Sequence, residues 1–353
     1  MKSVFVSAGI AVMAAIAPLE ARAASFSQLY VFGDSLLDAG NLFRASSALS
    51  PLGIPQSPPY AQRLSNGPVW VEYLADSFEL EPALFADLLL NPLATDVSEG
   101  INFGVAGAST GTNNTVVPDF PLDTGALAQV TAFSSLVNFS GVPPAEDALF
   151  VYLAGGNDFA GSEAMPAETD ITVPLQNTSA ALQALVGSGA KNILVSSLPD
   201  LSLTPRFLGT PEAPTLSSRV TDYNTALSAL VEDFVSATPD VNFIDFDLNG
   251  ELLNAIANPD KFDFANVTDA CLTDYSFPID LDGFTVCDTP DQFLFWDDFH
   301  PTTQGHKFVA QAALSQLDGR DPDPKAVSIP ESGMIGGMLV LMTAAGGTRL
   351  LRR

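Results

Sequence analysis

Histidine, cysteine and basic side chains are scarce in this chain of 353 residues. It contains 2 histidines and 2 cysteines, and 14 Lys and Arg residues stand against 41 Asp and Glu, for a net charge of -27 at pH 7. Such an acidic surface repels phosphate groups, which argues against nucleic acid or an anionic lipid surface as the main partner. The charge balance fits an exported, soluble protein, and a hydrophobic fraction of 47% allows a large core.

The first 24 residues have the pattern of a secretory signal peptide. Lys2 supplies a positive start, residues 4–18 are apolar, and Ala21-Arg22-Ala23 offers small residues for cleavage before Ala24. The apolar part is too short for a stable membrane span. We therefore expect export to the periplasm, the cell surface or the medium, with a mature chain that starts near Ala24.

The two cysteines fit an oxidising compartment. Cys271 and Cys287 flank a segment rich in Asp, Thr, Pro and Gly. Two thiols alone are a poor ligand set for a metal ion, so a disulfide that closes this loop is the better interpretation.

The C-terminal end combines a polar linker, residues 319–332, with an apolar stretch that ends in arginines, residues 333–353. This pattern predicts a tail anchor with its basic end in the cytoplasm, and a buried C-terminal helix is the alternative. The arrangement resembles the PEP-CTERM sorting signal of exported bacterial proteins, although Ile329-Pro330-Glu331-Ser332 lacks the second proline of the usual motif. The resemblance implies membrane contact only through this tail, and a sorting protease as a partner.

Between these ends, apolar runs of strand length alternate with longer segments of helical period. The strand candidates are continuously apolar, which is typical of strands buried on both faces; they are residues 29–32, 148–154, 192–196 and 241–246. The helix candidates are residues 66–78, 124–138, 174–188, 213–237 and 303–318. This alternation predicts one domain, residues 25–318, with a parallel sheet between helices. In such sheets ligands bind at the carboxyl ends of the strands.

The few histidines restrict any chemistry that needs an imidazole base to His300 and His306. Asp297 precedes His300 by three residues, so on a single turn its carboxylate can accept a hydrogen bond from one ring nitrogen. The other nitrogen is then free to take a proton from a hydroxyl group. Asp298 has the wrong offset for this role. His306 falls inside the last expected helix, where we expect a surface or packing residue.

A serine nucleophile and its oxyanion donors can be placed at three turns. Ser35 follows the first strand in Gly33-Asp34-Ser35, and its own N–H could donate to an oxyanion. The N–H of Gly107 in "INFGVAGAST" and the side-chain amide of Asn157 in "YLAGGNDF" are two further candidates. Taken singly, each segment is as often a plain turn.

Taken together, these segments resemble a known family. "FGDSLLDAGN", "INFGVAGA", "AGGNDF" and "DDFHP" resemble, in this order, the four signature blocks of the GDSL family of lipases and esterases, the SGNH hydrolases. The resemblance extends over residues 28–318. It implies Ser35 as nucleophile and first oxyanion donor, Gly107 and Asn157 as the other donors, and His300 as the base oriented by Asp297. The segment "SNGPVWVEYLA" also resembles part of this family, which makes Trp70 a candidate for the acyl site, with a core tryptophan as the alternative.

The resemblance implies an α/β/α sandwich of flavodoxin-like type with a five-stranded parallel sheet. It also implies two-step acyl transfer on an ester of a small molecule or lipid, without a metal ion or an organic cofactor. An acyltransferase or a carbohydrate O-deacetylase on the same site is an alternative, because one fold carries many activities. A surface protein that only binds would be marked by loss of Ser35 or His300, and both are present. The apolar segment 78–94 could form an acyl groove or a core helix.

Overall fold

Six parallel strands form the central sheet in the computed structural model, which describes residues 26–319 except 51, 163–164 and 276–282. The strands lie in the order β2-β3-β1-β4-β5-β6. Their bounds are β1 (Leu29–Gly33), β2 (Ala83–Leu84), β3 (Gly100–Asn102), β4 (Leu149–Leu153), β5 (Asn192–Ser196) and β6 (Asn242–Phe246). The expected signal peptide, and the linker and tail beyond residue 319, lie outside the described residues.

The central strands are buried on both faces, as their continuous apolar sequence predicts. All five residues of β4 are at most 1% exposed. Leu149, Val151 and Leu153 face one core cluster, and Phe150 and Tyr152 face the other. Because side chains point alternately to the two faces of the sheet, every residue of a strand is buried only where helices cover both faces.

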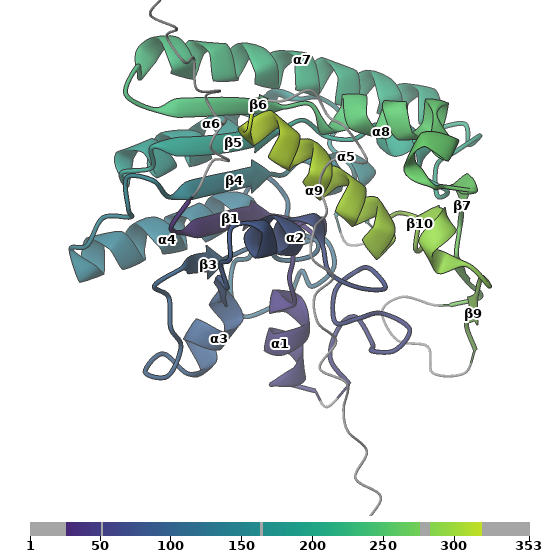
Figure 1. Ribbon diagram of the computed structural model, residues 1–353, viewed down its shortest axis with the longest axis horizontal. Helices are drawn as coiled ribbons and strands as arrows, with labels where there is room; N and C mark the ends of the chain where they lie inside the picture. The colour runs from purple at the N-terminus through teal and green to yellow at the C-terminus, as the bar shows by residue number, and fades with distance from the viewer. Residues whose placement is uncertain (1–25, 51, 163–164, 276–282, 320–353) are drawn as a thin grey trace, which may run out of the picture.

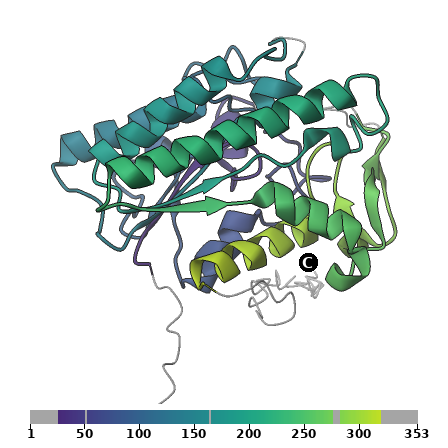
Figure 2. The same cartoon turned by 90° about the horizontal axis from the view of Figure 1, so that it is seen from above.

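Helices form a layer on each face of the sheet (Figures 1 and 2). Helices α2 (Trp70–Ser77), α8 (Leu248–Ala257) and α9 (Thr303–Leu317) contribute to the first core cluster. Helices α4 (Ala126–Ser140), α5 (Gly156–Ala160), α6 (Thr172–Gly187) and α7 (Ala213–Ala237) contribute to the second. The expected α/β/α sandwich is confirmed, and the five expected helices are present with ends shifted by at most four residues.

The sheet has one strand more than the expected five, and segment 78–94 accounts for the difference. This segment is neither a groove at Ser35 nor one core helix: it forms the two-residue edge strand β2 and then α3 (Phe85–Leu90). Leu93 is fully exposed. Within this segment Pro82 and Pro92 lie on either side of β2 and α3, and because proline disfavours helix in the residue before it, α3 stays short. Helix α1 (Asn41–Ser47), which packs against α3, was also not expected.

Small β-structures brace the chain before α9. Strand β10 (Phe293–Phe295) pairs with β7 (Asn266–Ala270), and β8 (Leu272–Thr273) pairs with β9 (Thr285–Val286). A disulfide joins Cys271 to Cys287, and the N–H of Leu272 donates to the Trp296 carbonyl oxygen at 2.6 Å. Because of this hydrogen bond, the loop that the disulfide closes is attached to Trp296, the residue before Asp297.

Three short 3-10 turns complete the described elements: η1 (Leu201–Leu203), η2 (Pro259–Phe262) and η3 (Pro290–Gln292).

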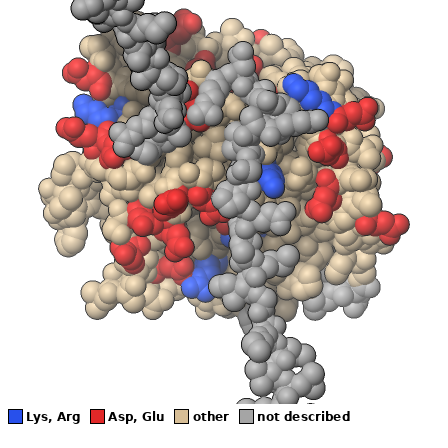
Figure 3. Space-filling model, viewed as in Figure 1, with Lys and Arg blue, Asp and Glu red and all other residues tan. Residues whose placement is uncertain are grey.

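Acidic side chains predominate on the face of the molecule shown in Figure 3, where only a few Lys and Arg side chains are visible, most of them near Asp or Glu. This distribution agrees with the net charge of -27. Among the described residues, no helix has the length and apolar character needed to cross a membrane.

Candidate active site

Ser35 follows the carboxyl end of β1, in a turn that leaves no room for a side chain at Gly33. A Cβ on Gly33 would overlap the carbonyl oxygen of Leu153 in the neighbouring strand. The Gln129 side-chain amide from α4 holds the turn, accepting from the Gly33 N–H at 2.8 Å and donating to the Gly33 carbonyl oxygen at 2.8 Å. The end of β1, Gly33 and Gln129 together fix the backbone position from which the Ser35 side chain extends.

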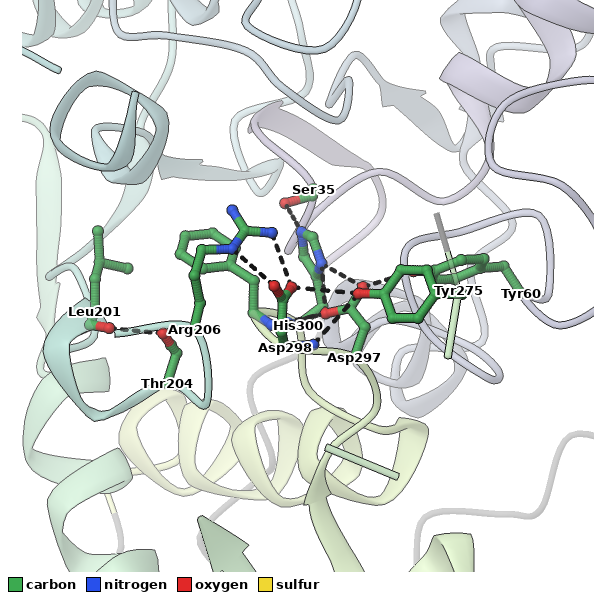
Figure 4. A network of polar contacts seen from close by, with 10 residues as sticks. Ser35, Tyr60, Leu201, Thr204, Arg206, Tyr275, Asp297, Asp298 and His300 are labelled. Carbon is green, nitrogen blue, oxygen red and sulfur yellow. Dashed lines mark hydrogen bonds and ion pairs between the residues drawn. The ribbon is translucent and has the colours of Figure 1, made fainter. Parts of the chain in front are cut away.

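Ser35, His300 and Asp297 form one continuous hydrogen-bonded chain (Figure 4). The Ser35 Oγ lies 2.9 Å from His300 Nε2, and His300 Nδ1 lies 2.9 Å from Asp297 Oδ2. All three side chains are buried. The structure therefore brings together residues that are 265 positions apart in sequence, in the order hydroxyl, imidazole and carboxylate.

The Asp297–His300 turn has the geometry that the three-residue spacing predicts. Asp297 Oδ1 accepts from the N–H groups of Phe299 at 2.8 Å and His300 at 2.6 Å. Burial alone would raise the pKa of Asp297, but the neighbouring His300 ring and these hydrogen bonds outweigh it and lower the pKa. The carboxylate therefore stays charged beside the imidazole. Thr302 caps α9 just after this turn, accepting from the Gly305 N–H at 3.1 Å.

The three expected oxyanion donors line one cleft of about 350 Å³, together with Ser35 Oγ and His300. Gly107 has φ 84°, and a Cβ there would collide with the Asn114 side chain. Among the described residues no hydrogen bond uses the N–H of Ser35 or Gly107, so both remain available to a ligand. Asn157 is oriented by two contacts: its Nδ2 donates to the Ala108 carbonyl oxygen at 3.0 Å, and its Oδ1 accepts from Thr115 at 3.2 Å. The second Nδ2 hydrogen has no acceptor among the described residues.

Replacing Asn157 with alanine is expected to lower kcat by about a hundredfold or somewhat more. The amide would stabilise negative charge that develops only in the transition state, and losing one such donor costs about 3 kcal/mol. Steady-state hydrolysis of a nitrophenyl ester measures the effect. The control is Asn177→Ala, which removes a half-buried side-chain amide that donates to Thr110 and lies outside the lining of the cleft. Unchanged kcat in the Asn157 variant would show that this residue is not an oxyanion donor.

Two further carboxyl groups are buried beside the cleft. Burial raises the pKa of Asp34 to about 7 and that of Asp158 to about 6. Asp158 accepts from the N–H and the hydroxyl group of Thr110, at 2.8 and 2.7 Å. These contacts join the α5 turn that carries Asn157 to the loop that carries Gly107. They therefore hold the Asn157 amide and the Gly107 N–H at a fixed position relative to each other.

Trp70 and His306 lie outside the cleft, and both are buried at 1% exposure. Both line a separate apolar cavity that also reaches Ser35. His306 is thus a packing residue rather than a surface residue, and neither ring nitrogen has a hydrogen-bond partner among the described residues.

Unfolding at acid pH is expected to depend on His306. Burial, followed by the nearby His300, lowers the pKa of His306 to about 3 from a usual value of 6.5. Below pH 6.5 the unfolded chain binds a proton at this residue and the folded protein does not, so stability is lost as pH falls from 6.5 towards 3. The full loss is on the order of 5 kcal/mol. His306→Leu should therefore gain stability over the wild type as pH falls, in urea unfolding at several pH values. Parallel pH profiles for the two proteins would contradict this.

Three side chains around the triad could not be predicted from the sequence: Tyr60, Arg206 and Tyr275 (Figure 4). Tyr60 Oη donates to Asp297 Oδ2 at 2.9 Å. Arg206 forms an ion pair with Asp298 at 2.8 Å and lies 4.7 Å over the Phe299 ring. No motif or spacing marks these residues, because each comes from a loop that reaches the site only in the folded chain.

The chain is similar to known proteins over most of its length. The family model described as GDSL-like Lipase/Acylhydrolase matches residues 29–313. The thermolabile hemolysin of Vibrio parahaemolyticus is 27% identical over 297 residues, which cover 82% of this chain and 63% of that protein, less than two thirds of its length. A GDSL lipase of Tanacetum cinerariifolium is 24% identical over 308 residues, covering 80% of this chain and 82% of that one.

Among solved structures, a variant of an acetyl xylan esterase from Geobacillus stearothermophilus aligns with 84% of this chain and 97% of its own, at 15% identity and a TM-score of 0.41. Within the described residues there is no cluster of three or more His, Cys, Asp or Glu side chains that could hold a metal ion. With the family model matching residues 29–313, the chain belongs to the GDSL-like lipase/acylhydrolase family and is a carboxylic ester hydrolase.

Proposed function

We propose that the protein is an exported serine esterase that works through an acyl-enzyme on Ser35. The observation that carries the proposal is the chain of contacts from Ser35 Oγ to His300 Nε2 and from His300 Nδ1 to Asp297, each 2.9 Å. An imidazole held by a buried carboxylate on one nitrogen, with a serine hydroxyl on the other, can take the hydroxyl proton as the oxygen attacks.

The reaction has two steps that share one base. Ser35 Oγ attacks the ester carbonyl carbon while its proton moves to His300 Nε2, and the resulting oxyanion is held by the N–H groups of Ser35 and Gly107 and the Asn157 amide. The C–O bond to the alcohol then breaks, and His300 protonates the departing oxygen. Water attacks the acyl-enzyme and gives a proton to His300, which returns it to Ser35 as the carboxylic acid leaves.

An alkyl fluorophosphonate tests the nucleophile directly, because it reacts only with an activated serine. We expect one phosphonyl adduct per chain, on the peptide that contains Ser35, identified by mass spectrometry. His300→Ala should lose this labelling, since the hydroxyl would have no base. An adduct on another residue, or none in a protein that hydrolyses esters, would overturn the assignment.

The apolar cavity that reaches Ser35 supports a substrate with an apolar acyl group. Ser35 and Phe299 line both this cavity and the cleft, so the two spaces meet at the nucleophile. The other walls include Trp70, Leu198, Leu252 and Val309. The cavity measures about 60 Å³. This is several times the roughly 10–15 Å³ that one water needs, so the cavity has room for a short acyl chain. We assign the acyl chain to this cavity and the alcohol to the polar cleft.

Filling the cavity is expected to shorten the preferred acyl chain. Among acetyl, butyryl, hexanoyl and lauroyl nitrophenyl esters, the wild type should prefer the butyryl and hexanoyl esters. Leu252→Trp should lower hexanoyl hydrolysis by roughly tenfold or more and leave acetyl hydrolysis within a few-fold, because each methylene that is no longer buried costs about 0.8 kcal/mol. Leu253→Trp is the matched control, since Leu253 is the next residue of α8 and is 46% exposed. Acetyl preference in the wild type would instead favour the O-deacetylase alternative.

Export is part of the proposal. It is supported by the signal-peptide pattern of residues 1–24 and by a disulfide between the only two cysteines. Membrane contact through residues 333–353, and a sorting protease that acts near residues 329–332, belong to the same proposal. The intact mass of protein recovered from the periplasm or medium should correspond to a chain that starts near Ala24. Recovery only in the cytoplasm with Met1 retained would contradict export.

A further inference from the structure

Tyr60 lies outside the triad but contacts the carboxylate of Asp297. Its Oη donates to Asp297 Oδ2 at 2.9 Å, across 237 residues of sequence. We propose that Tyr60 is a positioning residue of the hydrolytic reaction: its hydroxyl holds the Asp297 carboxylate in the orientation that fixes the His300 ring. This inference rests on the proposed roles of Ser35, His300 and Asp297.

The donors around Asp297 show what Tyr60 adds. Oδ1 accepts from the N–H groups of Phe299 and His300, both in the same turn as Asp297. Oδ2 accepts from His300 Nδ1 at 2.9 Å and from Tyr60. Among the described residues, Tyr60 is therefore the only donor to this carboxylate from outside residues 297–300. Without Tyr60, the only hydrogen bond to Oδ2 would come from the His300 ring, which is the group that the carboxylate orients.

Tyr60 is itself held in place by a small core. It is 5% exposed and belongs to the third core cluster, with Leu64, Trp296 and the disulfide-bonded Cys271. The Tyr275 ring packs edge-on against it, with the ring centroids 6.3 Å apart. A phenol packed this way loses little further conformational freedom when it donates to the carboxylate.

Burial and the Asp297 charge keep the Tyr60 hydroxyl protonated, so it can donate a hydrogen bond. Burial and then the adjacent Asp297 charge raise the pKa of Tyr60 far above its ordinary value, so the hydroxyl stays protonated at any working pH. The next residue, Asp298, accepts from Tyr275 Oη at 3.3 Å and pairs with Arg206 at 2.8 Å. Each tyrosine thus donates to one of two adjacent aspartates: Tyr60 to the one that contacts His300, and Tyr275 to the one that does not (Figure 4).

Tyr60→Phe is the first test, because phenylalanine keeps the buried ring and removes only the hydroxyl. We expect kcat to fall roughly ten- to fiftyfold with KM little changed, in line with a hydrogen bond to a charged group. The acid limb of the pH–rate profile should also move to higher pH, since a carboxylate with one donor fewer holds a proton on the imidazole more tightly. The control is Tyr152→Phe, which removes the hydroxyl of another buried tyrosine: Tyr152 is 1% exposed, its Oη lies 3.2 Å from Thr178 Oγ1, and it lines neither the cleft nor the apolar cavity. It should leave kcat within a few-fold and the pH profile in place.

A double-mutant cycle separates a positioning role from a structural one. In an Asp297→Asn background, Tyr60→Phe should lower kcat by less than about threefold, because residues that act through one another are not additive. An equal loss in both backgrounds would overturn the proposal, as would an unmoved pH profile or an equal effect of Tyr152→Phe. Near-ultraviolet circular dichroism and urea unfolding of each variant show whether the fold is retained. If Ser35→Ala kept full activity, the proposed function itself would fail, whatever the Tyr60 variants did.

Discussion

Ser35→Ala is expected to lower kcat for nitrophenyl ester hydrolysis by about four to six orders of magnitude. Alanine keeps the turn after β1, and the oxyanion donors stay in place, so substrate binding should change little. What is lost is the oxygen that forms the acyl-enzyme, and in a serine hydrolase the loss of the nucleophile costs nearly as much as the loss of the whole triad. The residual rate would come from the oxyanion donors and substrate binding alone.

A matched serine distinguishes this effect from the loss of any buried hydroxyl. Ser315 on α9 is 5% exposed, close to the 4% of Ser35, and lines neither the cleft nor the apolar cavity. Ser315→Ala should therefore retain activity within a few-fold. Substantial hydrolysis by Ser35→Ala, free of contaminating esterase, would mean that another group attacks the ester and would remove the acyl-enzyme mechanism.

The sequence was most informative where one short pattern implies one local geometry. Strands β4 and β5 were predicted within one residue at each end, because an uninterrupted apolar run of this length has few alternatives to a doubly buried strand. The Asp297–His300 contact could be predicted for a similar reason. A spacing of three residues on one turn brings the two side chains together, and with only two histidines in the chain there was little to choose between.

Contacts between distant loops could not be predicted in this way. Tyr60 lies in a loop with no periodicity, and nothing in its sequence context indicates a carboxylate partner 237 residues away. The edge strand β2 was missed because two residues are too few to carry an alternating or continuous apolar pattern. The apolar cavity is likewise a property of the folded chain, since its walls come from α2, α8, α9 and the loops after β1, β4 and β5.

Asp297→Asn is expected to lower kcat by about four orders of magnitude while leaving the fold intact. Asparagine has the same shape, and its Oδ1 can keep the hydrogen bonds from the Phe299 and His300 N–H groups. Its amide nitrogen then takes the position of Oδ2 and presents an N–H to His300 Nδ1. The imidazole must accept there, so its own proton moves to Nε2, where it blocks proton transfer from Ser35. The measurement is kcat for a nitrophenyl ester across a range of pH.

The adjacent aspartate is the control for this prediction. Asp298 is half-exposed and pairs with Arg206, so Asp298→Asn removes the same charge one residue away without touching the His300 ring. Exposed ion pairs of this kind contribute about 0–1 kcal/mol, and activity should stay within a few-fold of the wild type. If both variants lost activity equally, the effect would come from the charge of the segment, and Asp297 would have no special role. A large loss in Asp297→Asn alone would instead show that catalysis depends on which ring nitrogen carries the proton, because that is what differs between the two substitutions.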